Sequence, residues 1–245
     1  MSAIILRSCV RAQRLALLVV LAHSPSRGQG VECPPGCGPG RWSNEAVDLS
    51  SARGKAPYET RDIRVASPDR QKIARIVKDI WWIETDGAKI APGPNASKIL
   101  YPAELAWAPD SRALYITEGS GYSTGYRVHI YRLEDHKLHH VTDLNQTLQH
   151  DFERRHKCSD GQSPNIAGLH WMNNSQQLLI VSEVPPVGIC VDMEYFGGYL
   201  VAVDSGKIVE RYSPEALKDR WEDALGYRLK DDFAELSAEQ RVALP

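Results

Sequence analysis

The chain has 245 residues, 42% of them hydrophobic, with 29 basic side chains against 31 acidic ones. This composition excludes collagen-like and compositionally disordered proteins and predicts a globular fold. Residues 1–30 hold four arginines and no acid, so the rest of the chain carries 25 basic and 31 acidic side chains, a formal charge of −6. A nucleic-acid partner is not expected, because binding to a phosphate backbone needs clustered positive charge.

Residues 1–30 have the order of features typical of a secretory signal peptide. Three arginines precede the apolar run Leu15–Ala22, and small residues follow at Gly28 and Gly30. The run is shorter than the roughly 20 residues that cross a bilayer, and an uncleaved amphipathic helix is the alternative. We expect a protein exported to the periplasm or the extracellular space, with no integral membrane segment after cleavage.

Residues 31–61 are rich in Gly, Pro and Ser and show neither helical nor strand periodicity. They predict a loosely ordered tail, in which Cys33 and Cys37 could form a local bridge. From residue 62 to residue 212, short β-branched and aromatic runs alternate with turn signals, which predicts strands of antiparallel sheets. Residues 213–245 are predicted to be helical, with Ser213 as the N-cap and Pro214 at the first helical position.

The predicted β domain repeats one sequence pattern. ELAWAPDSRALYITEG at 104–119 aligns with GLHWMNNSQQLLIVSE at 168–183, which places Trp107 opposite Trp171 and Leu114 opposite Leu178. A weaker copy, ASPDRQKIARI, occupies 66–76. Each copy begins a predicted four-stranded antiparallel meander, and such a sheet buries its faces only against neighbouring copies. The predicted fold class is all-β: repeated meanders in a partial or irregular β-propeller, followed by a short C-terminal helical segment.

The pattern W-x-P-D-S-x-x-L-x-I, followed by the strand YRVHIYRL, resembles the repeat of TolB-like β-propellers and of prolyl-oligopeptidase propeller domains. The resemblance covers residues 62–212; it implies a propeller fold and leaves the function open. The third unit lacks the Pro-Asp pair and the first lacks the Trp. About three units are visible, whereas a closed propeller needs at least about four blades. The array is then open, a blade lies elsewhere, or the chain is a fragment; a β-sandwich with similar hairpins is the alternative.

One motif suggests a serine nucleophile. Gly121-Tyr-Ser123-Thr-Gly125 fits the pattern G-x-S-x-G, but a nucleophile elbow requires a strand followed by a helix. Here a second predicted strand follows, and no hydrolase domain remains to supply His and Asp. We therefore predict no catalytic residue.

Histidines are crowded between residues 129 and 170. A zinc site would use His150, His156 and Cys158 in a predicted long loop. His139 and His140 are predicted to lie on a strand, where successive side chains point to opposite faces and cannot share one ion. We interpret these histidines as solvated and predict no metal and no cofactor.

Four of the five cysteines follow residue 30, and an even number in an exported chain favours disulfides. Cys158 precedes the first strand of the third unit, and Cys190 lies between its second and third strands. Because a meander reverses direction at each turn, both connections lie on one side of the sheet, which predicts a Cys158–Cys190 bridge. Two unrelated thiols are the alternative. Cys33 is expected to pair with Cys37 or to remain in the tail.

Two functions are compatible with these features. The first is an exported, non-catalytic, propeller-like scaffold that binds another protein. The second is a secreted hydrolase or ligand-binding protein that uses the insert at residues 145–163, whose length and polar side chains suit a site. Titratable groups that converge near His150 and His156 would favour the second, and scattered, solvated ones the first.

Overall fold

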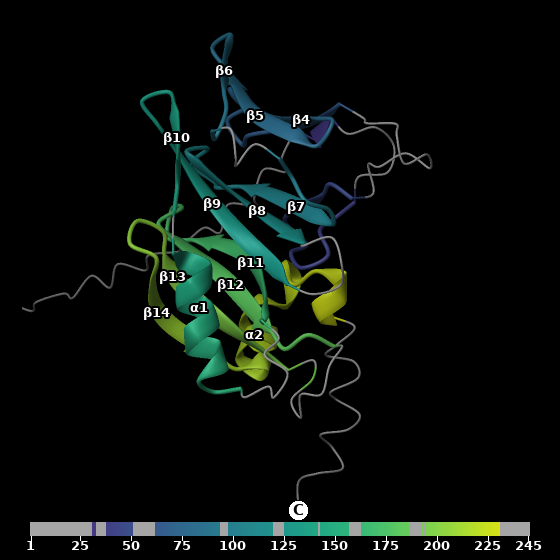
Figure 1. Cartoon of the computed structure of the whole chain (residues 1–245), viewed down its shortest axis with the longest axis vertical. Helices are drawn as coiled ribbons and strands as arrows, with labels where there is room; N and C mark the ends of the chain where they lie inside the picture. Colours follow the sequence, from purple (N-terminus) through teal and green to yellow (C-terminus); the bar gives the residue numbers. More distant parts are fainter. Residues whose placement is uncertain are drawn as a thin grey trace, which may run out of the picture.

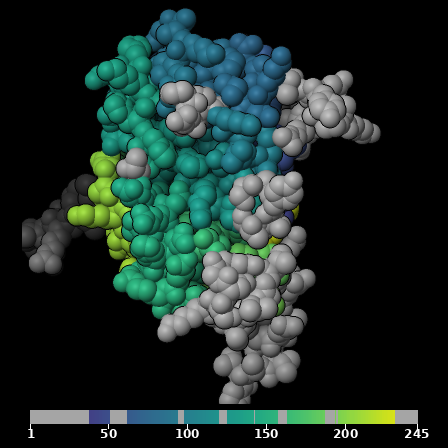
Figure 2. Space-filling model, in the orientation of Figure 1, coloured from purple at the N-terminus to yellow at the C-terminus, as the bar shows by residue number. Residues whose placement is uncertain are grey.

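The computed structural model describes residues 31–32, 38–50, 62–93, 98–119, 125–141, 143–156, 163–186, 193 and 195–230. These residues form three antiparallel sheets that follow one another along the long axis of the molecule (Figure 1). Each sheet contains one four-stranded meander, as predicted for an all-β chain. Figure 2 shows the first unit (blue) and the second (teal) joined in one continuous surface.

The three meanders are called units 1, 2 and 3. Unit 1 consists of β3 (Ile63–Ala66), β4 (Lys72–Val77), β5 (Ile80–Thr85) and β6 (Ala88–Ile90). Unit 2 consists of β7 (Ala103–Trp107), β8 (Ala113–Gly119), β9 (Tyr126–Glu134) and β10 (Lys137–His140). Unit 3 consists of β11 (Asn165–Met172), β12 (Gln177–Glu183), β13 (Phe196–Ala202) and β14 (Lys207–Tyr212). Two short strands extend the first two sheets: β1 (Val31–Glu32) beside β3, and β2 (Val47–Asp48) beside β7.

The repeat in the sequence is a repeat in the structure. Trp107 lies opposite Leu114 across β7 and β8, and Trp171 lies opposite Leu178 across β11 and β12. Both tryptophans are buried, and both leucines are fully buried. The prediction that these pairs occupy equivalent positions is confirmed.

The units stack face to face through apolar side chains. Trp107 and Leu114 belong to a core shared with unit 1, and the Trp107 indole donates a 2.9 Å hydrogen bond to the carbonyl of Val65. Trp171 and Leu178 belong to the next core, shared with unit 2. Each sheet therefore buries a face against the unit before it, as expected of repeats that cannot bury their faces alone.

Truncation of Leu114 or Leu178 to alanine should destabilise the protein by about 2–5 kcal/mol, because each removes fully buried methyl groups and leaves a cavity. Urea unfolding of Leu114→Ala, Leu178→Ala and the wild-type chain measures the difference. Val209→Ala is the control, since Val209 is 53% exposed in β14. A loss no larger than that of the control in both variants would contradict the stacked arrangement.

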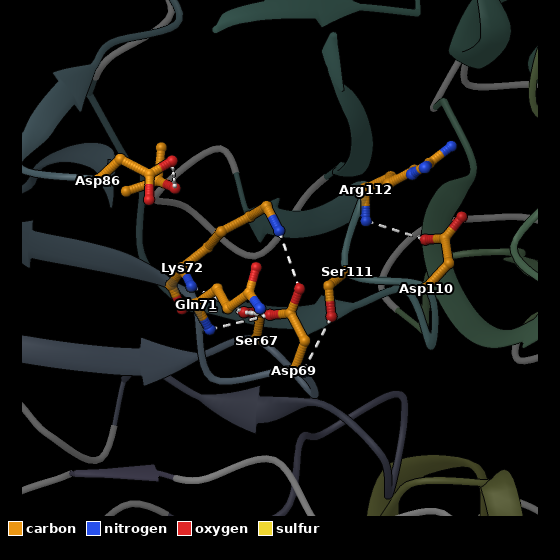
Figure 3. Close-up of polar contacts among 9 residues, drawn as sticks. Ser67, Asp69, Gln71, Lys72, Asp86, Asp110, Ser111 and Arg112 are labelled. Carbon is orange, nitrogen blue, oxygen red and sulfur yellow. Dashed lines mark hydrogen bonds and ion pairs between the residues drawn. The ribbon is translucent and has the colours of Figure 1, made fainter.

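The turns between the first two strands of each unit also join neighbouring units. The backbone N–H of Asp69 in unit 1 donates to the hydroxyl of Ser111 in unit 2, at 3.0 Å (Figure 3). The N–H of Asp110 donates to the hydroxyl of Ser175 in unit 3, at 3.2 Å. Arg70 stands in unit 1 where Ser111 and Ser175 stand in units 2 and 3. All three of these residues have a positive φ, of 60° to 72°. The same joint is thus used twice along the stack.

The outer face of unit 1, which points away from unit 2, is charged. Arg75 pairs with Asp62 at 2.7 Å and with Glu84 at 2.8 Å, and the Trp82 indole donates to Glu84 at 3.1 Å. The ammonium group of Lys89 lies 3.7 Å from the centre of the Trp82 ring. Burying this network under another sheet would require desolvation of several charges. The stack of described units therefore ends at this face.

The predicted loose tail is wrong for residues 38–50, here called the strap. Trp42 and Leu49 are buried, the latter completely. The N–H of Leu49 donates to the carbonyl of Ala103, beside the β2–β7 pairing, and the Ser43 hydroxyl donates to the carbonyl of Leu169. The strap is ordered because Trp42 and Leu49 are buried and its backbone pairs with the edge strand β7. Cys33 and Cys37 lie outside the described residues.

The long loop predicted at residues 150–161 is wrong over its first part, because residues 150–153 belong to α1 (Leu144–Glu153). Leu144, Leu148 and Phe152 recur every four residues, are buried, and join the core between units 2 and 3. This spacing places them on one face of a helix.

The predicted helix after unit 3 is confirmed as α2 (Pro214–Trp221), and the Ser213 hydroxyl accepts the N–H of Ala216 at 3.3 Å. A 3₁₀ turn, η1 (Glu222–Ala224), follows. Trp42 of the strap, Leu217 of α2 and Leu225 cover the outer face of unit 3. In the part of the chain that the structure describes, no helix has the length and apolar character needed to span a membrane. Residues 231–245 of the predicted helical segment and the predicted signal peptide lie outside that part.

Candidate functional site

The loop that carries the G-x-S-x-G pattern connects two strands. Gly119 at the end of β8 pairs with Tyr126 at the start of β9, and the two strands are antiparallel neighbours. Ser123 itself lies outside the described residues. The strand-to-strand context agrees with the prediction of a hairpin and lacks the helix that a nucleophile elbow requires.

The histidines singled out as zinc ligands have different surroundings. His150 is exposed on α1 and lines a hollow of about 730 Å³ together with Thr147, Glu153 and Arg154. His156 stacks on Tyr195, with 4.1 Å between the ring centres. Among the described residues, no group of three or more His, Cys, Asp or Glu side chains is arranged to hold a metal ion. Cys158 and Cys190 lie outside them, so their predicted bridge stays a prediction.

Sequence reasoning missed a line of hydrogen-bonded side chains at the border of units 1 and 2. Nδ1 of His129 lies 3.2 Å from Nε2 of His140, and its Nε2 lies 3.2 Å from a Glu118 carboxylate oxygen. His140 also stacks on Tyr131. Burial, and then the neighbouring His129, lower the pKa of His140, which favours the neutral ring. The line joins β8, β9 and β10.

A second missed feature is a basic cluster around one buried carboxylate, here called the Asp151 cluster. Arg211 of β14 donates to both oxygens of Asp151 at 2.9 Å, through Nε and Nη2. Arg154 donates to the same carboxylate at 2.8 Å and Arg155 at 3.0 Å, while Arg155 also donates to the hydroxyl of Tyr199. The hydrogen bond from Arg211, followed by the bond from Arg154, holds the pKa of Asp151 well below its usual range.

A third feature is a carboxyl group sealed beneath the strap. Glu104 in β7 is 2% exposed, and one of its oxygens accepts the N–H of Trp42 at 3.0 Å. A side chain on Gly40 would collide with the same oxygen, so the strap backbone lies directly on the carboxyl group. Burial raises the pKa of Glu104 to about 8, because the charged form loses its hydration. At neutral pH this carboxyl group is therefore mostly protonated.

The third buried acid, Glu183, binds Arg228, which follows η1. Glu183 at the end of β12 is fully buried, and Arg228 donates to both of its oxygens at 2.8–3.0 Å. Asn165 donates to one of these oxygens at 2.6 Å. The Arg228 guanidinium also lies over the ring of Trp42, 5.0 Å from its centre. This one arginine thus connects unit 3 with the strap.

The three acids share one arrangement: each bonds a segment far from it in sequence. Glu104 bonds the strap, Asp151 joins α1 to β14, and Glu183 joins β12 to Arg228. The carboxylate of Asp151, surrounded by guanidinium groups, binds protons weakly, which suits an ion pair better than proton transfer at neutral pH. Only folding brings these partners together, and the sequence patterns of single strands do not predict them.

No protein-family model, curated protein or solved structure matches this chain.

Proposed function

We propose that this protein is an exported, non-catalytic interaction protein whose three units act as consecutive blades of an open, propeller-like array. The main support for this proposal is that Glu104, Asp151 and Glu183 each connect two distant segments of the chain. These acids connect the segments of the array to one another, and the loops and outer strands remain for contact with another protein.

The repeated inter-unit joint supports the blade-like arrangement. Ser111 and Ser175 each accept an N–H from the preceding unit, whereas Arg70 occupies that position in unit 1. Unit 1 also carries the charged outer face described above. These features suit the first member of an open array, in keeping with the resemblance to TolB-like repeats. The proposal of export is supported by the arginines and apolar run within residues 1–30.

A ligand-binding or hydrolytic role for the insert at residues 145–163 is the second candidate. The hollow beside α1, with Thr147, His150 and Glu153 in its lining, favours it. A hydrolase of this kind would depend on His150 and Glu153, because both line the hollow and imidazole and carboxyl side chains serve as general acids and bases.

Two measurements on the full chain separate the candidates. Cross-linking and recovery from the native extracytoplasmic fraction should yield one partner protein in fixed proportion, with the same yield for His150→Ala and Glu153→Gln. Ester, peptide and glycoside substrates should not be turned over. Turnover by the wild-type chain that disappears in both variants would overturn the proposal in favour of the second candidate.

A further inference from the structure

We propose that the Asp151 cluster is the contact surface for an acidic, extended peptide segment of a partner protein. This inference rests on the proposed function and adds the place of contact and the chemistry of the partner.

The charges of the cluster do not balance. Arg154, Arg155 and Arg211 surround the single carboxylate of Asp151. The neighbouring carboxylate of Glu153 interacts with Arg127 and accepts a hydrogen bond from Gln149. Among the described residues of this part of the surface, four guanidinium groups thus face two carboxylates, which leaves them an excess of two positive charges.

The arginines of the cluster are accessible, whereas the acid is not. The side chain of Asp151 is 8% exposed, and those of Arg154, Arg155 and Arg211 are 75%, 44% and 47% exposed. A guanidinium group has five N–H donors, and Arg154 gives one of them to Asp151. The remaining donors of Arg154 can bind an incoming anion while Asp151 keeps the group in place.

The shape of the surface favours a peptide over a small anion. The arginines come from two elements, α1 and β14, and the hollow lined by Thr147 and His150 lies beside Arg154. β14 is the last strand of its sheet, so among the described strands none lies along its outer edge. An extended segment could follow this edge and place carboxylates on the arginines, whose planar groups match carboxylates in two-point contacts.

Binding of a fluorescent peptide of ten residues, alternating Glu and Ser, tests the proposal by anisotropy with the full chain at about 50 mM salt. The wild-type protein should bind it, and binding should weaken as salt screens the charges. Arg154→Gln should weaken it by up to about fivefold, since an exposed ion pair is worth at most about 1 kcal/mol. Arg154→Glu should weaken it further. Arg64→Gln is the matched control, because the side chain of Arg64 is 37% exposed in unit 1 and also pairs with a carboxylate.

The absence of peptide binding by the wild-type chain would overturn the proposal, and binding of inorganic phosphate in that case would indicate a small-anion site. Equal loss of binding in the Arg154→Gln and Arg64→Gln variants would also overturn it. Recovery of the partner by Arg154→Glu as efficiently as by the wild-type chain would refute this contact surface and leave the proposed function standing. Failure of the wild-type chain to recover any partner would instead refute the proposed function.

Discussion

Replacement of Glu104 by glutamine should raise stability at pH 8 and leave it nearly unchanged at pH 4. Because burial raises the pKa of Glu104 from 4.5 to about 8, the folded chain binds one more proton than the unfolded chain between these values. The stability of the wild-type protein is then lost as pH rises through this window, by on the order of 4 kcal/mol from this one group. Glutamine is neutral at every pH and removes that dependence.

Urea unfolding at pH 4, 6 and 8 measures the effect as the difference between variant and wild type, in which contributions of other titrating groups cancel. Glu134→Gln is the control, since the side chain of Glu134 is 48% exposed, and its curve should run parallel to the wild type. Identical pH profiles for Glu104→Gln and the wild-type chain would show that this carboxyl group is ionised and hydrated in the folded protein.

Replacement of Arg228 by methionine should destabilise the protein by about 3–5 kcal/mol. The substitution leaves Glu183 as a fully buried carboxylate without its cation, and an uncompensated buried charge is among the costliest defects in a protein. Packing of the arginine over Trp42 is lost as well. Chemical unfolding of the variant at pH 7 gives the free energy directly.

The double variant Glu183→Gln/Arg228→Met separates charge from packing. Removing both charges should recover much of the loss, because the penalty of the single variant comes from the unpaired acid. Arg220→Met, at an exposed ion pair, should cost less than about 1 kcal/mol. If the single variant is no less stable than this control, Glu183 is not held as a buried ion.

The meanders could be predicted from the sequence because their information is local. The β-branched and aromatic runs of these units, and the shared spacing from Trp107 to Leu114 and from Trp171 to Leu178, indicate the strands and their pairing within about ten residues. Helix α1 also had a local signal, the four-residue spacing of Leu144, Leu148 and Phe152. The other residues of α1 are polar, and for this reason the segment is interpreted as part of a loop from the sequence alone.

The strap and the candidate site could not be predicted because their contacts join distant parts of the chain. Trp42 and Glu104 are 62 residues apart, and Asp151 and Arg211 are 60 residues apart. The polar sequence around Trp42 contains no pattern that predicts pairing of this segment with the edge of β7. Glu104 stands in the otherwise apolar strand β7, but its burial depends on the strap that covers it. The sequence of β7 alone therefore does not predict a buried acid.

The position of the strap has a consequence for the order in which this chain can fold. The N–H of Gly226 donates to the carbonyl of Trp42, that of Arg228 donates to the carbonyl of Arg41, and Asn44 bonds Asp223 across 179 residues. These contacts cannot form until almost the whole described chain has left the ribosome. Loop closure over such separations is slow because its entropic cost precedes the gain from the contacts. Units 1 and 2 can therefore form before these contacts exist, whereas unit 3 and the strap are completed late in folding.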